Sequence, residues 1–454
     1  MVWSWGLEGV VNRERGRRSN RRSPSAGRGG GAAPTAVLTI DSIAAGGEGV
    51  GRLEDGRVTF VHRTAPGDRV EVALTERRER WARGRLLKIL EPSPVRRDPP
   101  CAFYLDCGGC TLEHMTYEAQ LQAKARIVAD ALTRIGKIEV EPPVVIASPK
   151  QQRYRNRVSF ALRRLGDGHV VAGFHALGNA ERVVDVDGRC LLPEEPIARV
   201  WDLLREAWGA DVRHLPAGER LRLTLRSSTD GEVMLLIEGG YSPGNPEELL
   251  RSVEGLTAIW HQPGGAGPEL IAGAPGLPES WGDETVELTG TAFLQVNRAA
   301  AALLEQHVLG EIGEVVGLRV VDAYCGVGLH ARRLARAGAE VIGIEMDAAA
   351  VAAATAAAPQ GATFLEGAVE MILPGVLPAD IVILNPPRAG LAAEVPETLR
   401  ADPPHRVIYI SCNPATLARD LQRLGAGFHL DTIHCFDLFP QTAHVETVVA
   451  LRRT

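Results

Sequence analysis

Several side chains that can take part in chemistry follow apolar segments near the carboxyl end of the chain. Cys325 and Glu345 come after two such segments, and Asn385 and Cys412 follow two more. A cysteine whose thiolate is stabilised can act as a nucleophile. A carboxylate within reach, such as that of Glu446 further along, can move a proton. The residue types therefore indicate nucleophilic and acid–base chemistry.

The segments that precede these residues predict an open, mainly parallel α/β sheet. Residues 319–322 and 341–344 are apolar runs typical of buried strands, with a stretch of helical periodicity between them. The same alternation continues with the apolar runs at 380–384 and 406–410. The carboxyl ends of parallel strands meet at one crevice, so we expect the four residues to share a site that Glu446 can reach.

The turn after the first of these strands favours a nucleoside cofactor. It reads Asp322-Ala-Tyr-Cys-Gly-Val-Gly328, and its two glycines, Gly326 and Gly328, let the backbone approach a ligand closely. Glu345 ends the next strand, where its carboxylate can accept both ribose hydroxyls. A dinucleotide fingerprint needs a third glycine, where this chain has Ala331. The loop resembles that of class I S-adenosylmethionine (SAM) methyltransferases.

The N-terminal part of the chain has a different texture. Residues 1–35 are rich in Arg, Gly, Ser and Pro, which predicts a disordered basic tail. Short strand-like runs separated by glycines follow over residues 36–95 and predict a small β-barrel. Arginines around Trp81 suit RNA backbone and bases, although an ordinary charged hairpin is the other interpretation. This segment resembles a TRAM domain, an OB-like RNA-binding barrel.

A strand-rich central domain is predicted over residues 96–290, and it contains four cysteines. Cys101, Cys107 and Cys110 are closely spaced, and Cys190 stands far downstream. An odd total of seven cysteines in a chain with no secretory signal argues against a disulfide framework. Four thiolates can hold an iron–sulfur cluster or zinc, and buried free thiols are the remaining interpretation.

The composition is that of a globular protein with about two to four domains. We find no apolar stretch long enough to span a bilayer and no secretory signal, so we expect a cytoplasmic protein. The net charge of −6 argues against bulk affinity for nucleic acid but allows a basic patch. The run Arg153-Tyr-Arg-Asn-Arg157 could clamp phosphates and stack bases, or could be a solvated strand end.

Together the motifs resemble those of the RNA uracil-C5-methyltransferase family, from residue 36 to the C-terminus. In the family's order they are Cys101-x5-Cys107-Gly-Gly-Cys110, Tyr154-Arg-Asn-Arg157, Phe293-Leu-Gln-Val-Asn297, Asp322-Ala-Tyr-Cys-Gly-Val-Gly328, Pro386-Pro-Arg388, Ser411-Cys-Asn-Pro414 and His444-Val-Glu446. The resemblance implies a Rossmann-like, SAM-dependent methyltransferase domain over residues 291–454. It also implies that the product is 5-methyluridine in tRNA or ribosomal RNA.

The resemblance assigns roles to individual residues. Cys412 matches the nucleophile, and Glu446 matches the general base. The residues that match the SAM site are Gln295, Tyr324, Glu345 and Asn385. The residues that match the ligands of a [4Fe–4S] cluster are Cys101, Cys107, Cys110 and Cys190. RNA is the implied partner, and we expect a monomer with no obligate protein partner and no membrane association.

Two departures from the family pattern leave other functions open. The family commonly has Asp-Pro-Pro-Arg, where this chain has Asn385, and Leu329 stands where some members carry a polar residue. Asn-Pro-Pro also occurs in amino-group methyltransferases, which usually follow it with an aromatic residue rather than with Arg388 and need no cysteine. A catalytically degenerate RNA-binding protein is the third possibility, and the presence of Cys412 and Glu446 argues against it.

Overall fold

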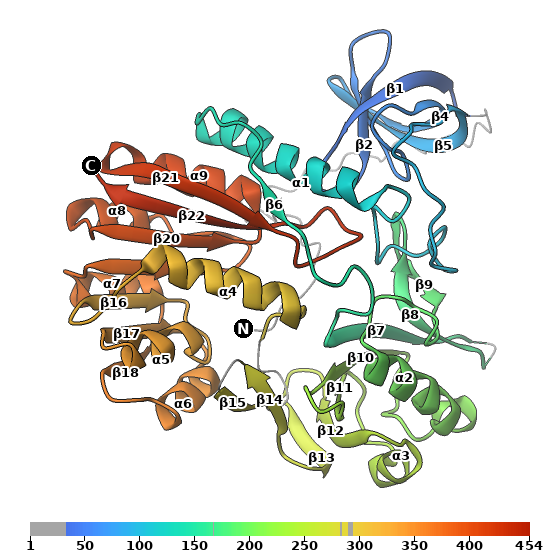
Figure 1. Cartoon of the computed structure of the whole chain (residues 1–454). Coiled ribbons are helices and arrows are strands. Elements are labelled where there is room, and N and C mark those ends of the chain that lie inside the picture. Colours follow the sequence, from blue (N-terminus) through green and yellow to red (C-terminus); the bar gives the residue numbers. More distant parts are fainter. Residues whose placement is uncertain (1–32, 167, 282–283, 289–293) are drawn as a thin grey trace, which may run out of the picture.

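A small barrel, a central sheet and an α/β domain make up the chain in the computed structural model, which describes residues 33–166, 168–281, 284–288 and 294–454 (Figure 1). All but the last three residues of the predicted disordered tail, residues 1–35, lie outside these ranges. In Figure 1 the blue barrel and the green central sheet lie on one side, and the orange and red α/β domain lies on the other. Every helix in the described ranges is too short or too polar to serve as a membrane span.

The predicted barrel is present and closed. Its strands are β1 Thr35–Ile43, β2 Gly49–Arg52, β3 Val58–Val61, β4 Arg69–Arg77 and β5 Trp81–Glu91. They close in the order β1-β2-β3-β5-β4. Leu38, Ile40, Val70 and Val72 alternate with more exposed residues along β1 and β4 and fill the interior. Period-two alternation thus gives this segment one buried face and one solvated face.

The central domain is a seven-stranded sheet in the order β13-β12-β11-β10-β7-β8-β9. Its strands are β7 Arg157–Arg164, β8 Val170–Ala176, β9 Asn179–Asp185, β10 Arg220–Ser227, β11 Val233–Glu238, β12 Leu256–Gln262 and β13 Glu269–Gly273. Helices α2 (Glu195–Ala207) and α3 (Pro246–Ser252) pack on one face, where Trp201 of α2 stacks on Phe160 at 4.0 Å between ring centroids. A hairpin of β14 (Leu277–Trp281) and β15 (Glu284–Leu288) follows.

The C-terminal domain is built on an eight-stranded sheet in the order β18-β17-β16-β19-β20-β22-β21-β6. Its strands are β16 Arg319–Ala323, β17 Glu340–Glu345, β18 Ala362–Glu366, β19 Ile381–Leu384, β20 Arg406–Ser411, β21 Phe428–Phe436, β22 Glu446–Arg453 and β6 Val145–Ile146. Strands β16 to β20 run parallel, as predicted, and β22 runs antiparallel to both of its neighbours. β19 is buried along its whole length, which is typical of a strand covered by helices on both faces.

Helices cover both faces of this sheet. They are α4 Arg298–Ile312, α5 Leu329–Arg336, α6 Ala348–Ala356, α7 Val369–Val376, α8 Glu394–Ala401 and α9 Pro414–Leu424. Apolar residues of α4 and α5 pack against one face, and those of α7, α8 and α9 pack against the other. Figure 1 shows α4 lying across the sheet in front of β16 and β20.

One segment of the predicted central domain joins the C-terminal sheet. Helix α1 (Tyr117–Ala131) and the π-helical turn Leu132–Gly136 place Val128 and Leu132 in the core beside α9. The two-residue strand β6 then pairs in parallel with β21 and is the outermost strand on that side of the sheet. Residues 117–146 therefore contribute to the core of the methyltransferase-like sheet, although the prediction assigns them to the central domain.

The Arg153–Arg157 run forms a joint between the two sheets. Tyr154 is 2% exposed and its hydroxyl donates to the carbonyl of Pro440 at 3.0 Å. The side-chain amide of Asn156 donates to the carbonyl of Gln295 at 3.1 Å. The hypothesis that Tyr154 stacks on bases is therefore wrong, because its ring is enclosed in the protein core.

Candidate active site

Cys412 and Glu446 lie together because of the register between β20 and β22. Ser411, the last residue of β20, pairs with Thr447. β20 and β22 are antiparallel, so Cys412, which follows Ser411, lies opposite Glu446, which precedes Thr447 and is the first residue of β22. Glu446 is buried, whereas Cys412 is partly exposed. Of the two groups, the thiol is therefore the more accessible to solvent.

Arg388, which follows β19, supplies positive charge to this pair. Burial raises the pKa of the Glu446 carboxyl to about 8, and the Arg388 guanidinium opposes this shift. Burial and the neighbouring Glu446 raise the pKa of the Cys412 thiol to about 12, again against the effect of Arg388. Arg388 is thus the side chain that favours the ionised forms of both groups. Sequence analysis gives it no role, although its position after two prolines at a strand end was an available signal.

His444 holds the Arg388 guanidinium in place. Nη2 of Arg388 donates to Nδ1 of His444 at 3.0 Å. An arginine can only donate, so Nδ1 is the acceptor and the imidazole is neutral. Burial and the nearby Arg388 charge lower the pKa of His444 to about 3, which keeps the ring neutral at physiological pH. The contact therefore fixes Arg388 without adding a second positive charge.

Helix α9 starts immediately after Cys412. The side-chain oxygen of Asn413 accepts from the backbone N–H of Ala415 at 3.1 Å and so caps the helix. The Asn413 amide nitrogen donates to the carbonyl of Arg388 at 3.1 Å, which ties together the segments that follow β19 and β20. The positive end of the helix dipole lies beside Cys412 and favours a thiolate there.

The predicted cofactor loop makes a tight turn after β16. Tyr324, Gly326 and Gly328 have positive φ angles of 64°, 56° and 74°. A Cβ on Gly326 would meet open space, so the backbone there is accessible to a ligand. A Cβ on Gly328 would lie 2.4 Å from the ring of Phe364. Gly328 is therefore required by packing, and close ligand approach, which we predicted for both glycines, is supported at Gly326.

Glu345 ends β17 beside this loop. Oε2 of its carboxylate accepts from the backbone N–H of Gly326 at 3.0 Å. Oε1 accepts from the N–H groups of Met346 and Asp347 at 2.7 and 2.9 Å. These three hydrogen bonds hold the carboxylate in one orientation. Oε2 accepts only one of them, so its second lone pair can still accept from a ligand.

Asp322 has an oxygen atom without a partner near the same loop. Its Oδ2 accepts from the N–H of Ala331 at 3.2 Å, while Oδ1 is buried and has no hydrogen-bond partner among the described residues. Burial raises the pKa of this carboxyl to about 6. Buried acceptors are normally satisfied, and two carboxylates at one loop disfavour a phosphate. These features fit a ligand that carries hydroxyl and amino donors, such as SAM.

The other predicted SAM-site residues border the loop from two further segments. Leu294, next to Gln295, packs in one apolar cluster with Val327 of the glycine turn. The N–H of Asn385 donates to the carbonyl of Ala323 at 3.2 Å. The structure therefore brings Tyr324, Glu345 and Asn385 to the carboxyl ends of neighbouring parallel strands, and it packs the segment that contains Gln295 against the glycine turn. Phe293, which begins the first of these motifs, lies outside the described residues.

The four predicted cluster cysteines line one small hollow. Its lining residues are Cys101, Phe103, Tyr104, Cys107, Gly109, Cys110, Phe174, Val186, Cys190 and Leu192. All four thiols are free of disulfides, and burial raises the pKa of each. Among the described residues, no three of these sulfur atoms lie within 4.8 Å of one another. Four thiols that line one hollow can ligate either a zinc ion or an iron–sulfur cluster.

Arg63 connects this hollow to the barrel. It follows β3, and its Nη1 donates to the carbonyl of Cys110 at 2.8 Å, while Nη2 donates to that of Cys107 at 2.6 Å. The guanidinium also lies 3.6 Å from the ring centroid of Tyr104. A change in the backbone of the cysteine loop would therefore alter the contacts of Arg63 and, through it, the position of the barrel relative to that loop. A lone arginine after a strand gave no sequence signal for this link.

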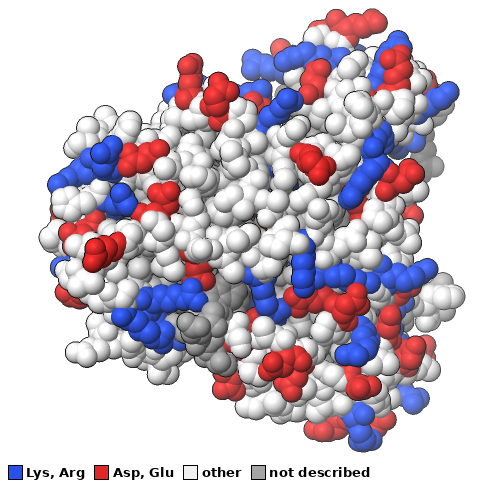
Figure 2. Space-filling model, viewed as in Figure 1, with Lys and Arg blue, Asp and Glu red and all other residues white. Residues whose placement is uncertain are grey.

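The barrel segment around Trp81 is compatible with both interpretations of its charges. Arg83 lies over the Trp81 ring at 5.8 Å, and Arg78 pairs with Glu76 at 2.7 Å. Figure 2 shows positive and negative side chains intermixed over the visible face, the barrel included. Exposed ion pairs contribute little energy, so such arginines can exchange a carboxylate for a phosphate.

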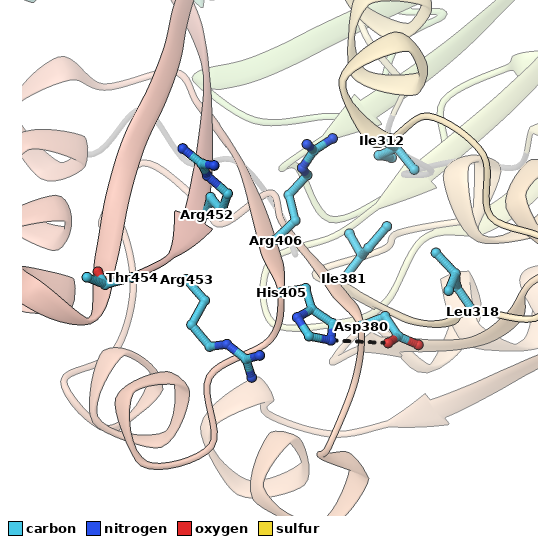
Figure 3. A pocket seen from close by; sticks show the side chains of 9 residues that line it. All are labelled: Ile312, Leu318, Asp380, Ile381, His405, Arg406, Arg452, Arg453 and Thr454. Atoms are coloured by element: carbon cyan, nitrogen blue, oxygen red, sulfur yellow. Dashed lines mark ion pairs between the residues drawn. The ribbon is translucent and has the colours of Figure 1, made fainter.

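A separate hollow of about 500 Å³ lies at the opposite ends of the strands (Figure 3). Its lining residues are Ile312, Leu318, Asp380, Ile381, His405, Arg406, Arg452, Arg453 and Thr454. β19 and β20 begin beside it, at Ile381 and Arg406. It is therefore at the amino ends of the parallel strands, where α/β enzymes do not place their reactive groups, and it is distinct from the site of Cys412.

Comparisons with known proteins agree with this architecture. Residues 376–454 match the family model of tRNA (Uracil-5-)-methyltransferase, and residues 37–87 match the TRAM domain. An uncharacterized RNA methyltransferase of Thermosynechococcus vestitus is 36% identical over 442 residues, which are 92% of this chain and 98% of that protein. One from Gloeobacter violaceus is 35% identical over 446 residues, with 92% and 97% covered.

A solved structure resembles nearly the whole chain. The tRNA (uracil-54, C5)-methyltransferase of Pyrococcus abyssi, in complex with S-adenosyl-L-homocysteine, matches with a TM-score of 0.71 and 27% identity. The match covers 91% of this chain and 99% of that one. The chain therefore belongs to the RNA uracil-C5-methyltransferase family, whose members are SAM-dependent enzymes, and it carries an N-terminal TRAM domain.

Proposed function

We propose that this protein methylates C5 of a uridine in structured RNA, either tRNA or ribosomal RNA, through a covalent bond between Cys412 and C6 of the base. The observation that carries the proposal is the placement of the Cys412 thiol beside the buried Glu446. Both lie at the same end of the sheet as the glycine turn and Glu345. A base reaching a cysteine at this edge must leave its stack, so the target is a flipped or looped nucleotide.

The thiol solves the first chemical problem of the reaction. C5 of uracil is too weak a nucleophile to attack a methyl sulfonium. Addition of the Cys412 thiolate to C6 moves the C5–C6 electron pair onto the ring as an enolate, which makes C5 nucleophilic. SAM, when bound, supplies the electrophilic methyl group. Arg388 and the start of α9 stabilise the thiolate that attacks in the first step of the reaction.

Glu446 solves the second problem. Once C5 carries both a methyl group and its original hydrogen, that proton must leave before the ring can regain its double bond. The Glu446 carboxylate accepts the proton, the C–H electron pair re-forms the C5–C6 double bond, and the Cys412 thiolate is expelled. A pKa raised to about 8 makes this carboxylate a stronger base than an exposed glutamate.

Four predicted residues would hold the cofactor. Glu345 is oriented by three backbone N–H groups and would accept the ribose hydroxyls. Gln295, Tyr324 and Asn385 border the same loop and would contact the remainder. Asp322, which begins the cofactor loop but was not predicted as a SAM-site residue, offers Oδ1 to a donor such as the amino group of SAM.

Asn385 also leaves room for a second function, methylation of an exocyclic amino group in nucleic acid. An asparagine at this position can accept from an amino group, as the Asn-Pro-Pro motif does in that enzyme class. Such a reaction needs no thiol. The position of Cys412 beside Glu446 favours the C5 reaction, and the requirement for the thiol separates the two functions.

RNA transcripts containing 5-fluorouridine should trap the enzyme when SAM is present. After methyl transfer, C5 carries fluorine where it would otherwise carry hydrogen. Glu446 then has no proton to remove, fluorine cannot leave as a cation, and the Cys412 thiolate cannot be expelled, so the adduct persists. We expect a denaturation-resistant complex that peptide mass spectrometry maps to Cys412. Unsubstituted transcripts serve as the control. An adduct on Cys325, the other cysteine of this edge, would contradict the assignment.

We further propose that Cys101, Cys107, Cys110 and Cys190 hold a [4Fe–4S] cluster that orders the RNA-binding region. The four thiols line one hollow, and four cysteine thiolates are the ligand set of such a cluster. The cluster takes no part in the methyl transfer. Arg63 holds the carbonyls of the cysteine loop, so the cluster would also steady the barrel.

Changing Cys110 to serine should remove the broad visible charge-transfer absorption and most of the iron of anaerobically purified protein. We expect RNA binding to weaken by roughly ten-fold, equivalent to one charge-assisted hydrogen bond lost between Arg63 and the loop. Cys435→Ser, at a buried cysteine far from the hollow, is the matched control. Wild-type protein that contains one zinc and no iron would contradict the cluster.

A further inference from the structure

A third group of metal-ligating side chains lies outside both sites described above. His307 and Glu311 stand one turn apart on α4, so they share a face of the helix. His434 lies on β21, on the same face of the strand as Phe436, which packs in the apolar cluster formed by α4. Ligand atoms of all three residues lie within 4.8 Å of one another.

Two nitrogen atoms of this group are buried without a partner. Nε2 of His307 and Nδ1 of His434 have no hydrogen-bond partner among the described residues. The His307 Nε2 atom is 3.7 Å from Oε1 of Glu311, too far for a hydrogen bond. Buried polar atoms normally have partners, so two unpartnered nitrogens in a group that also contains a carboxylate require an explanation.

Aromatic packing explains only part of the arrangement. The rings of His307 and His434 are 4.3 Å apart, and the ring of Phe436 is 5.4 Å from that of His307. These contacts account for the partial burial of both imidazoles. They leave the two nitrogen atoms without a partner, and a cation bound between the two imidazoles and the Glu311 carboxylate would satisfy both.

We propose that His307, Glu311 and His434 bind one divalent first-row metal ion, with Zn²⁺ as the favoured ion. Imidazole nitrogen and carboxylate oxygen are preferred zinc ligands, and three protein ligands leave a fourth position for water. Metal–ligand bonds of about 2.0–2.1 Å place tetrahedral ligand atoms about 3.3 Å apart. The observed 3.7 Å between His307 and Glu311 needs only a small adjustment.

The ion would fasten the carboxyl-terminal half of α4 to β21. The other end of α4 is already held by Asn297, which caps the helix and donates from its side chain to the carbonyl of Leu438 at 3.2 Å. A metal at His307 and Glu311 would fix the far end as well. α4 lies in front of the sheet in Figure 1, so the site joins a helix to the sheet it covers.

Zinc binding to the full-length protein tests the proposal. The protein is purified anaerobically, freed of loosely bound metal and titrated with Zn²⁺ alone. We expect the wild type to bind one Zn²⁺ more than His434→Ala and to gain several degrees in Tm that the variant does not gain. His429→Ala removes an exposed histidine from the same strand and should behave as wild type.

Two further measurements separate the possible outcomes. Glu311→Gln keeps the shape of the side chain and should weaken binding at least ten-fold even if His434→Ala folds poorly. Co²⁺ in place of Zn²⁺ should give a spectrum without thiolate charge transfer, which distinguishes this site from the cysteine hollow. Equal stoichiometry and equal Tm gain in the wild type, His434→Ala and Glu311→Gln would overturn the proposal.

Discussion

Changing Cys412 to alanine should reduce methyl transfer by a factor on the order of 10⁴ to 10⁶, the usual cost of losing a catalytic nucleophile. Without the sulfur atom no group can add to C6, and C5 stays too weakly nucleophilic to react. The substitution removes one atom from a partly exposed side chain. It leaves the Ser411–Thr447 pairing and the Asn413 cap in place, so the fold should persist. Single-turnover transfer from radiolabelled SAM measures the effect.

The same alanine change at Cys325 is the matched control. Cys325 lies on the same edge of the sheet, after β16 instead of after β20, and nothing in the proposed chemistry uses its thiol. We expect Cys325→Ala to keep turnover within about ten-fold of wild type. Binding of SAM and RNA to Cys412→Ala should be unchanged. If Cys412→Ala instead turns over at near the wild-type rate, the amino-group reaction favoured by Asn385 replaces the C5 reaction.

Long apolar runs made the sheets predictable, and short or glycine-rich strands were not. The run at 380–384 coincides with β19, Ile381–Leu384, because a strand buried on both faces is apolar throughout. β2, Gly49–Arg52, reads as a turn. Its glycines have a packing reason, since a Cβ on Gly51 would lie 2.2 Å from the carbonyl oxygen of Thr39. β6 is only two residues long and carries no periodic signal.

Strand topology also explains which parts of the site were predictable. Cys412 and Glu446 could be brought together from sequence because strand ends converge at one edge. The contact between Arg388 and His444 spans 56 residues and depends on side-chain direction, which periodicity does not report. Tyr154 was misassigned for a similar reason. An aromatic residue among arginines looks the same in sequence whether it faces RNA or the carbonyl of Pro440.

Glu446 makes the reaction depend on pH in a defined direction. It acts as a base only when ionised, and burial raises its pKa to about 8, so the rate should rise as pH increases through about 8. The effect on folding has the opposite sign. The folded pKa lies above the ordinary 4.5, so the contribution of this group to stability is fully present below pH 4.5. It is lost as pH rises through about 8.

Changing Glu446 to glutamine should separate methyl transfer from product release. Cys412 can still add to C6 and C5 can still accept the methyl group, but no carboxylate removes the C5 proton. We expect turnover to fall by roughly 10² to 10⁴-fold, the contribution of a general base. A methylated Cys412–RNA adduct should accumulate with ordinary, unfluorinated RNA and appear on denaturing gels. The rate increase through about pH 8 should disappear with the carboxylate.

Glu446→Asp provides the conservative comparison. It restores a carboxylate one methylene further from the base, so it should release the adduct slowly instead of trapping it. A purely structural role for Glu446 would make both variants lose adduct formation together with turnover, because the Cys412 site itself would be damaged. Turnover of Glu446→Gln at the wild-type rate would assign proton removal to another group. If the covalent RNA adduct accumulates in Glu446→Gln and is released in Glu446→Asp, the carboxylate must act after the methyl group has been transferred.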